Sequence, residues 1–250
     1  MAVKSAERVL EIFELLKFYP DGLTAKEISM ELGYAGSSTF ELLKTLSDWD
    51  YILMDGNKRY TLGGKLIQLG AYASAGLDLN KIATPILKKL RDDVQETVFM
   101  ATLSGNEIIY ISIVDSSRSI STNARLGGRK PLYCTGLGKA FLSFLPEEES
   151  NRLINELVFE KMTSNTLTDR EELRKQLGLF RIQGYAVDNE EIEEGLWCAA
   201  APVYDSTGKI KVAISISGPS IRLKNNVEKN VRELKLAAEA ISKKLGYYRR

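Results

Sequence analysis

The sequence predicts two domains: a small, mainly α-helical one, then a larger α+β one. Three observations support this division. Apolar residues recur at helical spacing before residue 64, strand-like runs rich in Val and Ile begin at residue 97, and 250 residues suffice for two modest domains. We place the first domain at residues 1–64, a linker helix at 65–76 and the second domain at 77–250.

Three helices and a hairpin account for the N-terminal domain. An apolar stripe between residues 9 and 16 predicts the first helix, which the sequence YPDG ends. Thr24 and Glu27 have capping-box spacing, so a second helix begins there and stops at Gly33. A third helix follows over about residues 36–48, and an Asp-Gly turn joins strands 51–54 and 59–62. This is a winged helix-turn-helix, whose third helix fits the major groove of double-stranded DNA.

The third helix and the hairpin carry the candidate DNA contacts. Leu42, Leu43 and Leu46 are expected to face the core. The outward residues of the helix and the basic residues of the wing are then the predicted DNA contacts: Ser37, Ser38, Phe40, Glu41, Lys44, Lys58 and Arg59. The serines suit phosphate oxygens at a helix N-terminus, and the wing residues suit phosphate or the minor groove.

Two of these residues have two interpretations each. Phe40 either touches a thymine methyl group or folds back against the wing. Glu41 either accepts a hydrogen bond from a cytosine amine or completes a capping box with Ser38. The charge of this domain leaves a further alternative open, because residues 1–64 hold seven basic and ten acidic side chains. Phosphate binding needs local rather than net positive charge, so this count does not exclude DNA. DNA is the favoured partner, and a protein-interaction module is the alternative.

The second domain mixes strands and helices. Helices are predicted over residues 79–95, 135–144, 146–156, 169–183 and 226–245, and strands over residues 97–103, 108–114, 185–188, 196–204 and 209–217. Thr168 and Glu171 have capping-box spacing at the start of the fourth of these helices. Ser215 and Ser217 share one face of the last strand. They either line a polar site or face solvent on a half-exposed sheet.

The composition excludes catalysis that depends on histidine, and no constellation of carboxylates or lysines favours another kind of enzyme. The chain has no histidine, which removes Ser-His-Asp and Cys-His catalysis and every histidine metal site. Its two cysteines, Cys134 and Cys198, cannot close a four-sulfur zinc site. We expect no catalytic residues, no metal and no other cofactor. A cysteine-dependent enzyme with Cys198 as nucleophile remains the catalytic alternative, although no histidine can activate that thiol.

The glycine-rich stretch PLYCTGLGKAF is not a nucleotide-binding P-loop. Such a loop needs a glycine where Tyr133 stands and a hydroxyl where Ala140 stands. What remains is a turn into a helix, whose free N–H groups attract small anions. The chain also has no apolar run of about 18 residues. Acidic residues interrupt its apolar start, and two cysteines make no disulfide framework, so we expect a cytoplasmic protein without membrane contact.

Motifs along nearly the whole chain resemble the IclR-type bacterial transcription regulators. The DNA-binding half of that family is similar to VKSAERVLEIFELL, LTAKEISMELGYAGSSTFELLKTL and RYTLGGKLIQLG. Its effector-binding half is similar to GGRKPLYCTGLGKAFLSFLP, IQGYAVDNEEIEEGLWCAAAPVYDSTG and VAISISGPSIR. The resemblance implies a winged helix-turn-helix, a linker helix and a GAF-like ligand domain. It also implies a homodimer or a dimer of dimers on a palindromic operator, acting as a repressor or an activator, of which we expect a repressor.

The resemblance also implies the effector site. The residues that match the family's ligand contacts are Gly136, Leu137, Asp188, Cys198, Ser215 and Ser217. Backbone N–H groups and hydroxyls donate to a carboxylate, so we expect a small organic acid or similar metabolite. The chain departs from the family pattern at Gly36, where a basic residue is common, and at Phe40 and Glu41, where His-Arg is frequent. It also departs at Tyr133, where His is common. The first departures bear on the operator sequence, and the one at Tyr133 bears on the pocket or on the dimer contacts.

Overall fold

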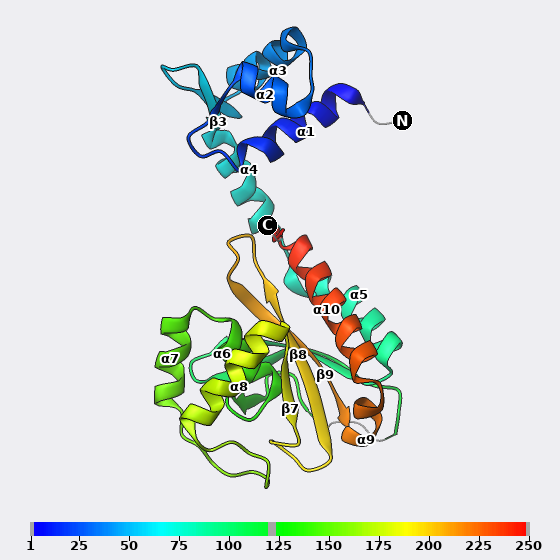
Figure 1. The fold of residues 1–250 in the computed structure, drawn as a ribbon. Coiled ribbons are helices and arrows are strands. Elements are labelled where there is room, and N and C mark those ends of the chain that lie inside the picture. The colour runs from blue at the N-terminus through cyan, green and yellow to red at the C-terminus, as the bar shows by residue number, and fades with distance from the viewer. Residues whose placement is uncertain (1–2, 120–123, 249–250) are drawn as a thin grey trace. The chain divides into compact units, whose positions relative to one another are not determined.

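The computed structural model describes residues 3–119 and 124–248, and its contacts divide the chain into two compact units, Met1–Leu77 and Asp78–Arg250 (Figure 1). Within the described residues, no helix has both the length and the apolar character needed to cross a membrane.

The N-terminal unit is a winged helix-turn-helix, as the sequence predicts. It contains α1 (Lys4–Leu16), α2 (Ala25–Leu32) and α3 (Gly36–Asp48), followed by the wing strands β2 (Ile52–Met54) and β3 (Arg59–Leu62). A short strand that the sequence did not predict, β1 (Leu23–Thr24), completes an antiparallel sheet of order β1-β3-β2. The core is formed by Ile12, Leu16, Leu23, Ile28, Leu43, Leu46, Ile52 and Tyr60. Leu42, expected inside, is only partly buried, and the helix α4 (Gly64–Ala75) follows.

Helix starts show how far capping patterns can be trusted. The capping box at Thr24 is confirmed, since Thr24 and Glu27 exchange both hydrogen bonds. The one expected at Ser38 is wrong, because α3 begins at Gly36 and the Ser38 hydroxyl donates to the Ala35 carbonyl at 2.9 Å. The one expected at Thr168 is also wrong. Asp169 caps that helix by accepting from the Glu172 N–H at 2.8 Å.

The C-terminal unit is built on a six-stranded antiparallel sheet of order β6-β5-β4-β9-β8-β7. Its strands are β4 (Thr97–Ser104), β5 (Glu107–Val114), β6 (Arg129–Pro131), β7 (Ala186–Asn189), β8 (Leu196–Tyr204) and β9 (Ile210–Pro219). The sequence predicted all of them except the short β6. Hairpin connections place β4 beside β5 and β8 beside β9, and the β4–β9 pair joins the two halves.

Helices cover both faces of this sheet (Figure 1). On one face lie α5 (Leu79–Val94) and α10 (Val227–Lys244), preceded by the short α9 (Ser220–Leu223) and η1 (Lys224–Asn226). On the other lie α6 (Gly136–Phe144), α7 (Glu147–Glu156) and α8 (Arg170–Gln183). Because side chains alternate along a strand, Ile214 and Ile216 of β9 fill the core beneath α5 and α10. The α+β architecture is thus confirmed, and the GAF-like description is consistent with it.

Close packing sets the position of α6. A Cβ atom on Gly138 would lie 2.4 Å from the Leu132 Cα and carbonyl oxygen, a distance at which backbone would have to move. Gly136 is less restricted, with the Cys198 Cβ at 3.3 Å from the corresponding position. The glycines of the turn therefore let α6 begin directly against the preceding loop and the sheet.

Candidate functional site

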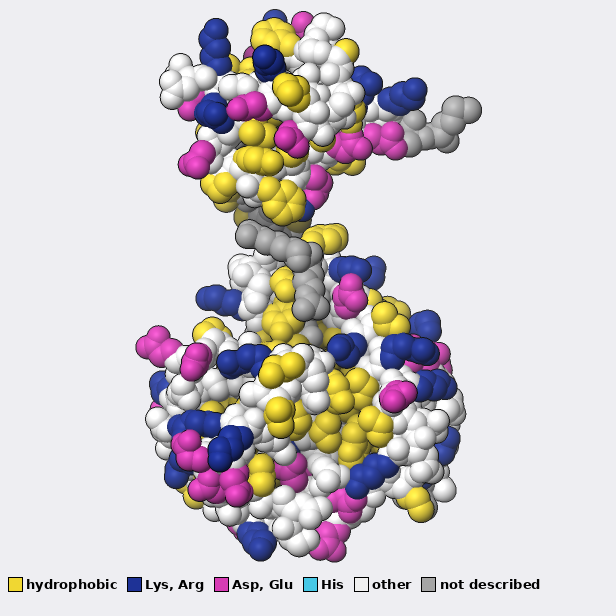
Figure 2. Space-filling view, viewed as in Figure 1, with side chains coloured by type: hydrophobic (Ala, Val, Ile, Leu, Met, Phe, Trp, Pro, Cys, Tyr) yellow, Lys and Arg dark blue, Asp and Glu magenta, His cyan; other side chains and the backbone are white. Residues whose placement is uncertain are grey.

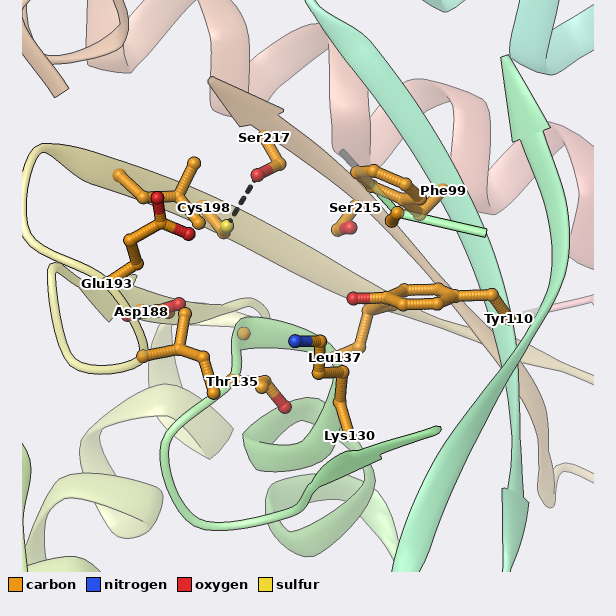
Figure 3. A pocket seen from close by; sticks show the side chains of 14 residues that line it. Phe99, Tyr110, Lys130, Thr135, Leu137, Asp188, Glu193, Cys198, Ser215 and Ser217 are labelled. Carbon is orange, nitrogen blue, oxygen red and sulfur yellow. Dashed lines mark hydrogen bonds between the residues drawn. The ribbon is translucent and has the colours of Figure 1, made fainter. Parts of the chain in front are cut away.

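A pocket opens in the C-terminal unit between the start of α6 and the strands β5, β8 and β9 (Figure 3). The cavity has a volume of about 80 Å³. The six predicted effector contacts all line it: Gly136, Leu137, Asp188, Cys198, Ser215 and Ser217. Ser215 and Ser217 are 1% and 3% exposed, so the alternative that they face solvent is wrong.

The strand wall of the pocket is polar and uncharged. Cys198 of β8 lies opposite Ser217 of β9 in the sheet register, and its thiol donates to the Ser217 hydroxyl at 2.8 Å. Burial, and then the nearby Asp188 carboxyl, raises the pKa of the Cys198 thiol well above its ordinary value. Cys198 is therefore a neutral thiol at physiological pH. Because Ser217 accepts from that thiol, its own proton is left to donate to a bound molecule.

The helix wall offers backbone donors. Thr135 caps α6, since its hydroxyl accepts from the Gly138 N–H at 3.0 Å while donating to the Pro131 carbonyl at 2.7 Å. The N–H groups of Gly136 and Leu137 precede the first helical hydrogen bond and have no acceptor among the described residues. Free donors at a helix N-terminus are a setting that suits a negatively charged group.

Asp188 supplies the acidic side of the pocket. Its Oδ1 accepts from the Glu191 N–H at 2.8 Å, whereas its Oδ2 is buried without a hydrogen-bond partner in the described structure. Burial raises the pKa of Asp188 to about 7 although the Glu191 N–H and Lys139 both lower it. The carboxyl group consequently exists in both protonation states near neutral pH.

A buried ion pair supports the loop that follows Asp188. Lys139 of α6 is fully buried, pairs with Glu191 and donates to the Gln176 Oε1 at 3.0 Å. The lysine of the P-loop-like stretch therefore serves the packing of α6 against this loop rather than a phosphate. Buried charges persist in proteins when they are paired in this way.

The pocket also contains residues that the sequence did not single out: Phe99, Tyr110, Ala124, Lys130, Thr135, Ile192, Glu193 and Leu196. Figure 3 shows the Lys130 ammonium and the Tyr110 hydroxyl pointing into the pocket. Lys130 stands on β6, which is too short for a periodic signal. Tyr110 stands on a strand whose pattern was recognised, but only the fold shows which of its faces meets the pocket.

The predicted DNA contacts are mostly surface residues of the N-terminal unit. Ser37, Glu41, Lys44 and Lys58 are exposed, and Lys58 has a left-handed backbone with φ 61° in the wing turn. Phe40 is 51% exposed, so half of its side chain is available for contact. On the face visible in Figure 2, acidic and basic side chains are interspersed over this unit.

Arg59 does not extend from the wing tip as expected. It lies on β3, its guanidinium donates to the Gly22 carbonyl at 2.7 Å, and it approaches the Glu27 carboxylate at 3.4 Å. These bonds hold the side chain against the start of α2, because the β1–β3 pairing brings that segment beside Arg59. Lys58 is therefore the better candidate for a phosphate contact.

The winged helix-turn-helix and the pocketed α+β unit define the class of DNA-binding transcription regulators that carry an effector-binding domain. Comparison with protein families agrees with this class. Residues 5–56 match the IclR helix-turn-helix domain, and residues 71–243 match the bacterial transcriptional regulator IclR C-terminal domain. The chain belongs to the IclR family, and it is a ligand-responsive transcription regulator.

Individual relatives span nearly the whole chain. The chain is 35% identical to the HTH-type transcriptional regulator KdgR of Dickeya chrysanthemi over 98% of its own length and 81% of that protein. It is also 35% identical to the HTH-type transcriptional repressor AllR of Escherichia coli, over 88% of its length and 82% of the relative. Among solved structures, IclR of Thermotoga maritima is 32% identical with a TM-score of 0.66, covering 98% of this chain and 99% of that one. The repressor BlcR of Agrobacterium tumefaciens is 27% identical with a TM-score of 0.83, covering 99% of both.

Proposed function

We propose that this protein is a repressor that binds a palindromic operator as a homodimer or a dimer of dimers, in the cytoplasm, and that a small organic acid controls it from the C-terminal pocket. We further propose the division into a DNA-binding domain (1–64), a linker helix (65–76) and an effector-binding domain (77–250). The observation that supports the effector class is the set of unpartnered donors on two facing walls of the pocket. The names of relatives, which include a repressor, support the sign of regulation.

The donors suit a carboxylate ligand with additional oxygen atoms. The N–H groups of Gly136 and Leu137 and the hydroxyls of Ser215 and Ser217 can donate to its oxygens. Asp188 accepts from a ligand hydroxyl when ionised and donates when protonated, and its pKa of about 7 makes both states accessible. Leu137 adds an apolar element to the wall.

DNA binding is proposed to use two copies of the N-terminal unit. One recognition helix reads too few bases for useful specificity, so a symmetric pair is needed. The helix α4 exposes apolar side chains that such pairing would cover, with Ile67 78% and Tyr72 74% exposed. Within each copy, the proposed contacts are Ser37, Ser38, Phe40, Glu41, Lys44 and Lys58, with Arg59 retained as a support of the wing.

We propose binding without chemical turnover. The transcription regulators in the same family are not enzymes. The thiol that lines the pocket, Cys198, donates to the Ser217 hydroxyl, and burial, followed by the nearby Asp188 carboxyl, raises its pKa well above the ordinary value. Nucleophilic cysteines instead have lowered pKa values and a neighbouring base or cation. Recovery of a chemically altered ligand after incubation with the pure protein would contradict this proposal.

A gel-shift assay with the DNA upstream of the protein's own gene tests the regulator. We expect a discrete shift that a subset of carboxylates, sugar acids and aromatic acids reverses. The Ser215→Ala, Ser217→Ala double variant should bind such an acid at least a hundredfold more weakly. Hydrogen bonds to a charged ligand contribute about 1.5–3 kcal/mol each, and about 2.7 kcal/mol corresponds to a hundredfold.

Ser206→Ala, at an exposed turn between β8 and β9, is the matched control and should bind like the parent. Unchanged affinity of the double variant would place the effector site elsewhere. A monomer at micromolar concentration that shifts no upstream fragment would contradict the whole proposal.

A further inference from the structure

We infer that Lys130 and Tyr110 form an anion subsite that orients the effector, with its carboxylate toward these two residues and a hydroxyl group toward Asp188. This inference rests on the proposed effector pocket and goes beyond it, because it assigns two residues that no sequence motif indicated. It also narrows the ligand from any small acid to a hydroxy acid held in one direction.

Lys130 is a cation without a counter-ion at the pocket. It stands on β6 opposite Ile108 of β5, is half-buried, and lines the cavity. Its ammonium group has neither an ion pair nor a hydrogen bond among the described residues. Its neighbour on the strand, Arg129, points to the other side and pairs with Glu107 at 3.0 Å. The other lysine near the pocket, Lys139, is neutralised by Glu191. An unpaired, half-buried ammonium attracts an anion more strongly than an exposed one.

Tyr110 places a neutral donor beside that charge. Its ring packs against Phe99 with centroids 5.0 Å apart, which fixes the direction of the phenol. Figure 3 shows the hydroxyl directed into the pocket, and it has no hydrogen-bond partner in the described structure. Burial, then the nearby Cys198 and Asp188, raises the pKa of Tyr110 above its ordinary value, so the group stays protonated and able to donate.

The opposite side of the pocket is acidic. Asp188 leaves its Oδ2 without a partner, and Glu193 is an exposed carboxylate at the rim. A ligand carboxylate placed there would meet like charge whenever Asp188 is ionised, whereas a ligand hydroxyl could donate to it. One side of the pocket therefore favours an anion and the other a hydroxyl donor. The serines and the N–H groups of Gly136 and Leu137 also line the pocket and can donate to other oxygen atoms of the ligand.

The test compares hydroxy acids with their primary amides on the full-length protein by calorimetry. The probes are gluconate, lactate and mandelate with gluconamide, lactamide and mandelamide, which differ within each pair only at the carboxyl group. The parent should bind at least one acid tenfold or more tightly than its amide. Lys130→Gln should lose tenfold or more in affinity for that acid and bind acid and amide alike. Lys130→Arg should keep the preference, and Tyr110→Phe should lose a smaller factor.

Lys175→Gln, at an exposed position of α8, is the matched control and should behave as the parent. Circular dichroism and gel shift confirm that each variant is folded and binds DNA. If the parent binds an acid through Ser215 and Ser217 but Lys130→Gln retains both affinity and preference, the inference is wrong and the proposed function stands. If the parent binds none of these acids at millimolar concentration, the acid effector and the subsite fail together.

Discussion

The proposed effector pocket and the proposed DNA-contact surface differ in how firmly the fold holds their residues. In the pocket, Asp188, Ser215 and Ser217 are at most 3% exposed and stand on strands of a sheet packed on both faces. On the recognition helix, Phe40 is 51% exposed. The fold itself therefore holds the residues that line the pocket, whereas packing within the protein leaves half of the Phe40 side chain uncovered.

This difference indicates where substitutions act. A change in the pocket alters packing, hydrogen bonds and titration within the folded C-terminal unit, so it affects stability as well as binding. We expect a change on the exposed face of α3 or in the wing turn to leave the fold intact and to alter the proposed contacts with DNA. Arg59 and Ser38 differ from the other predicted DNA contacts, because the guanidinium and the hydroxyl are hydrogen-bonded within the protein.

The largest expected effect is a loss of folding stability, and it distinguishes a glycine of the C-terminal unit from one of the N-terminal unit. Gly138→Ala places a methyl group 2.4 Å from Leu132 backbone atoms and should destabilise the C-terminal unit by about 3 kcal/mol or more. Gly36→Ala, at the start of α3, meets nothing within 4 Å and should leave stability unchanged or slightly improved. Urea unfolding, followed separately for the two units, measures both. Equal tolerance of the two substitutions would contradict the tight seating of α6.

A second prediction concerns the pH dependence of stability. The pKa of Asp188 is raised by burial to about 7 in the folded state, so the folded protein keeps a proton that the unfolded chain has released between about pH 4 and pH 7. Over that interval the group's contribution to the free energy of unfolding falls as pH rises, and above pH 7 it is constant. Asp188→Asn removes this dependence. Its Oδ1 can still accept from the Glu191 N–H.

The free energy of unfolding of Asp188→Asn relative to the parent should therefore rise by about 2–3 kcal/mol between pH 5 and pH 8. Urea titrations of both proteins at the two pH values measure the difference. A difference that is independent of pH would show that Asp188 is ionised throughout this range in the folded protein.

The smallest expected effects distinguish two neighbouring wing residues, one by its role in DNA binding and the other by its role in stability. Lys58→Ala should weaken binding to every DNA sequence and reduce the salt dependence by about one unit per lost phosphate contact, without a change in stability. Arg59→Ala should lower the stability of the N-terminal unit by about 1 kcal/mol, because the Gly22 carbonyl loses its donor. Gel shifts over a salt series and thermal unfolding distinguish the two. A reduced salt slope for Arg59→Ala with unchanged stability would mean that the guanidinium leaves Gly22 to contact DNA.

Local sequence patterns predicted the features that depend on neighbouring residues. The alternation along β9 placed Ser215 and Ser217 on one face and Ile214 and Ile216 on the other, because strand geometry alone fixes that relation. The strand pattern alone could not show that the serine face lines the pocket, since serines on a half-exposed sheet give the same pattern. Only the family resemblance predicted it.

Features that depend on distant pairing were missed. The three residues of β6 form a strand only because β5 offers them partners at Glu107, Ile108 and Ile109, so Lys130 carried no local signal. The partner of Arg59 lies at Gly22, well outside any local window. The Ser38 and Thr24 patterns look alike in sequence, yet only Thr24 caps a helix, because α3 had already started at Gly36.

The placement of the two thiols gives the molecule internal reporters. Cys134 and Cys198 are the chain's only cysteines, both lie buried in the C-terminal unit, and burial raises the pKa of each thiol. Cys134 is fully buried and Cys198 lies in the pocket wall, so the rate at which a thiol-reactive reagent modifies each sulfur follows how accessible its site becomes. Since Cys198 lines the pocket and Cys134 lies in the core behind α6, the two rates separate opening of the ligand site from wider unfolding without an introduced label.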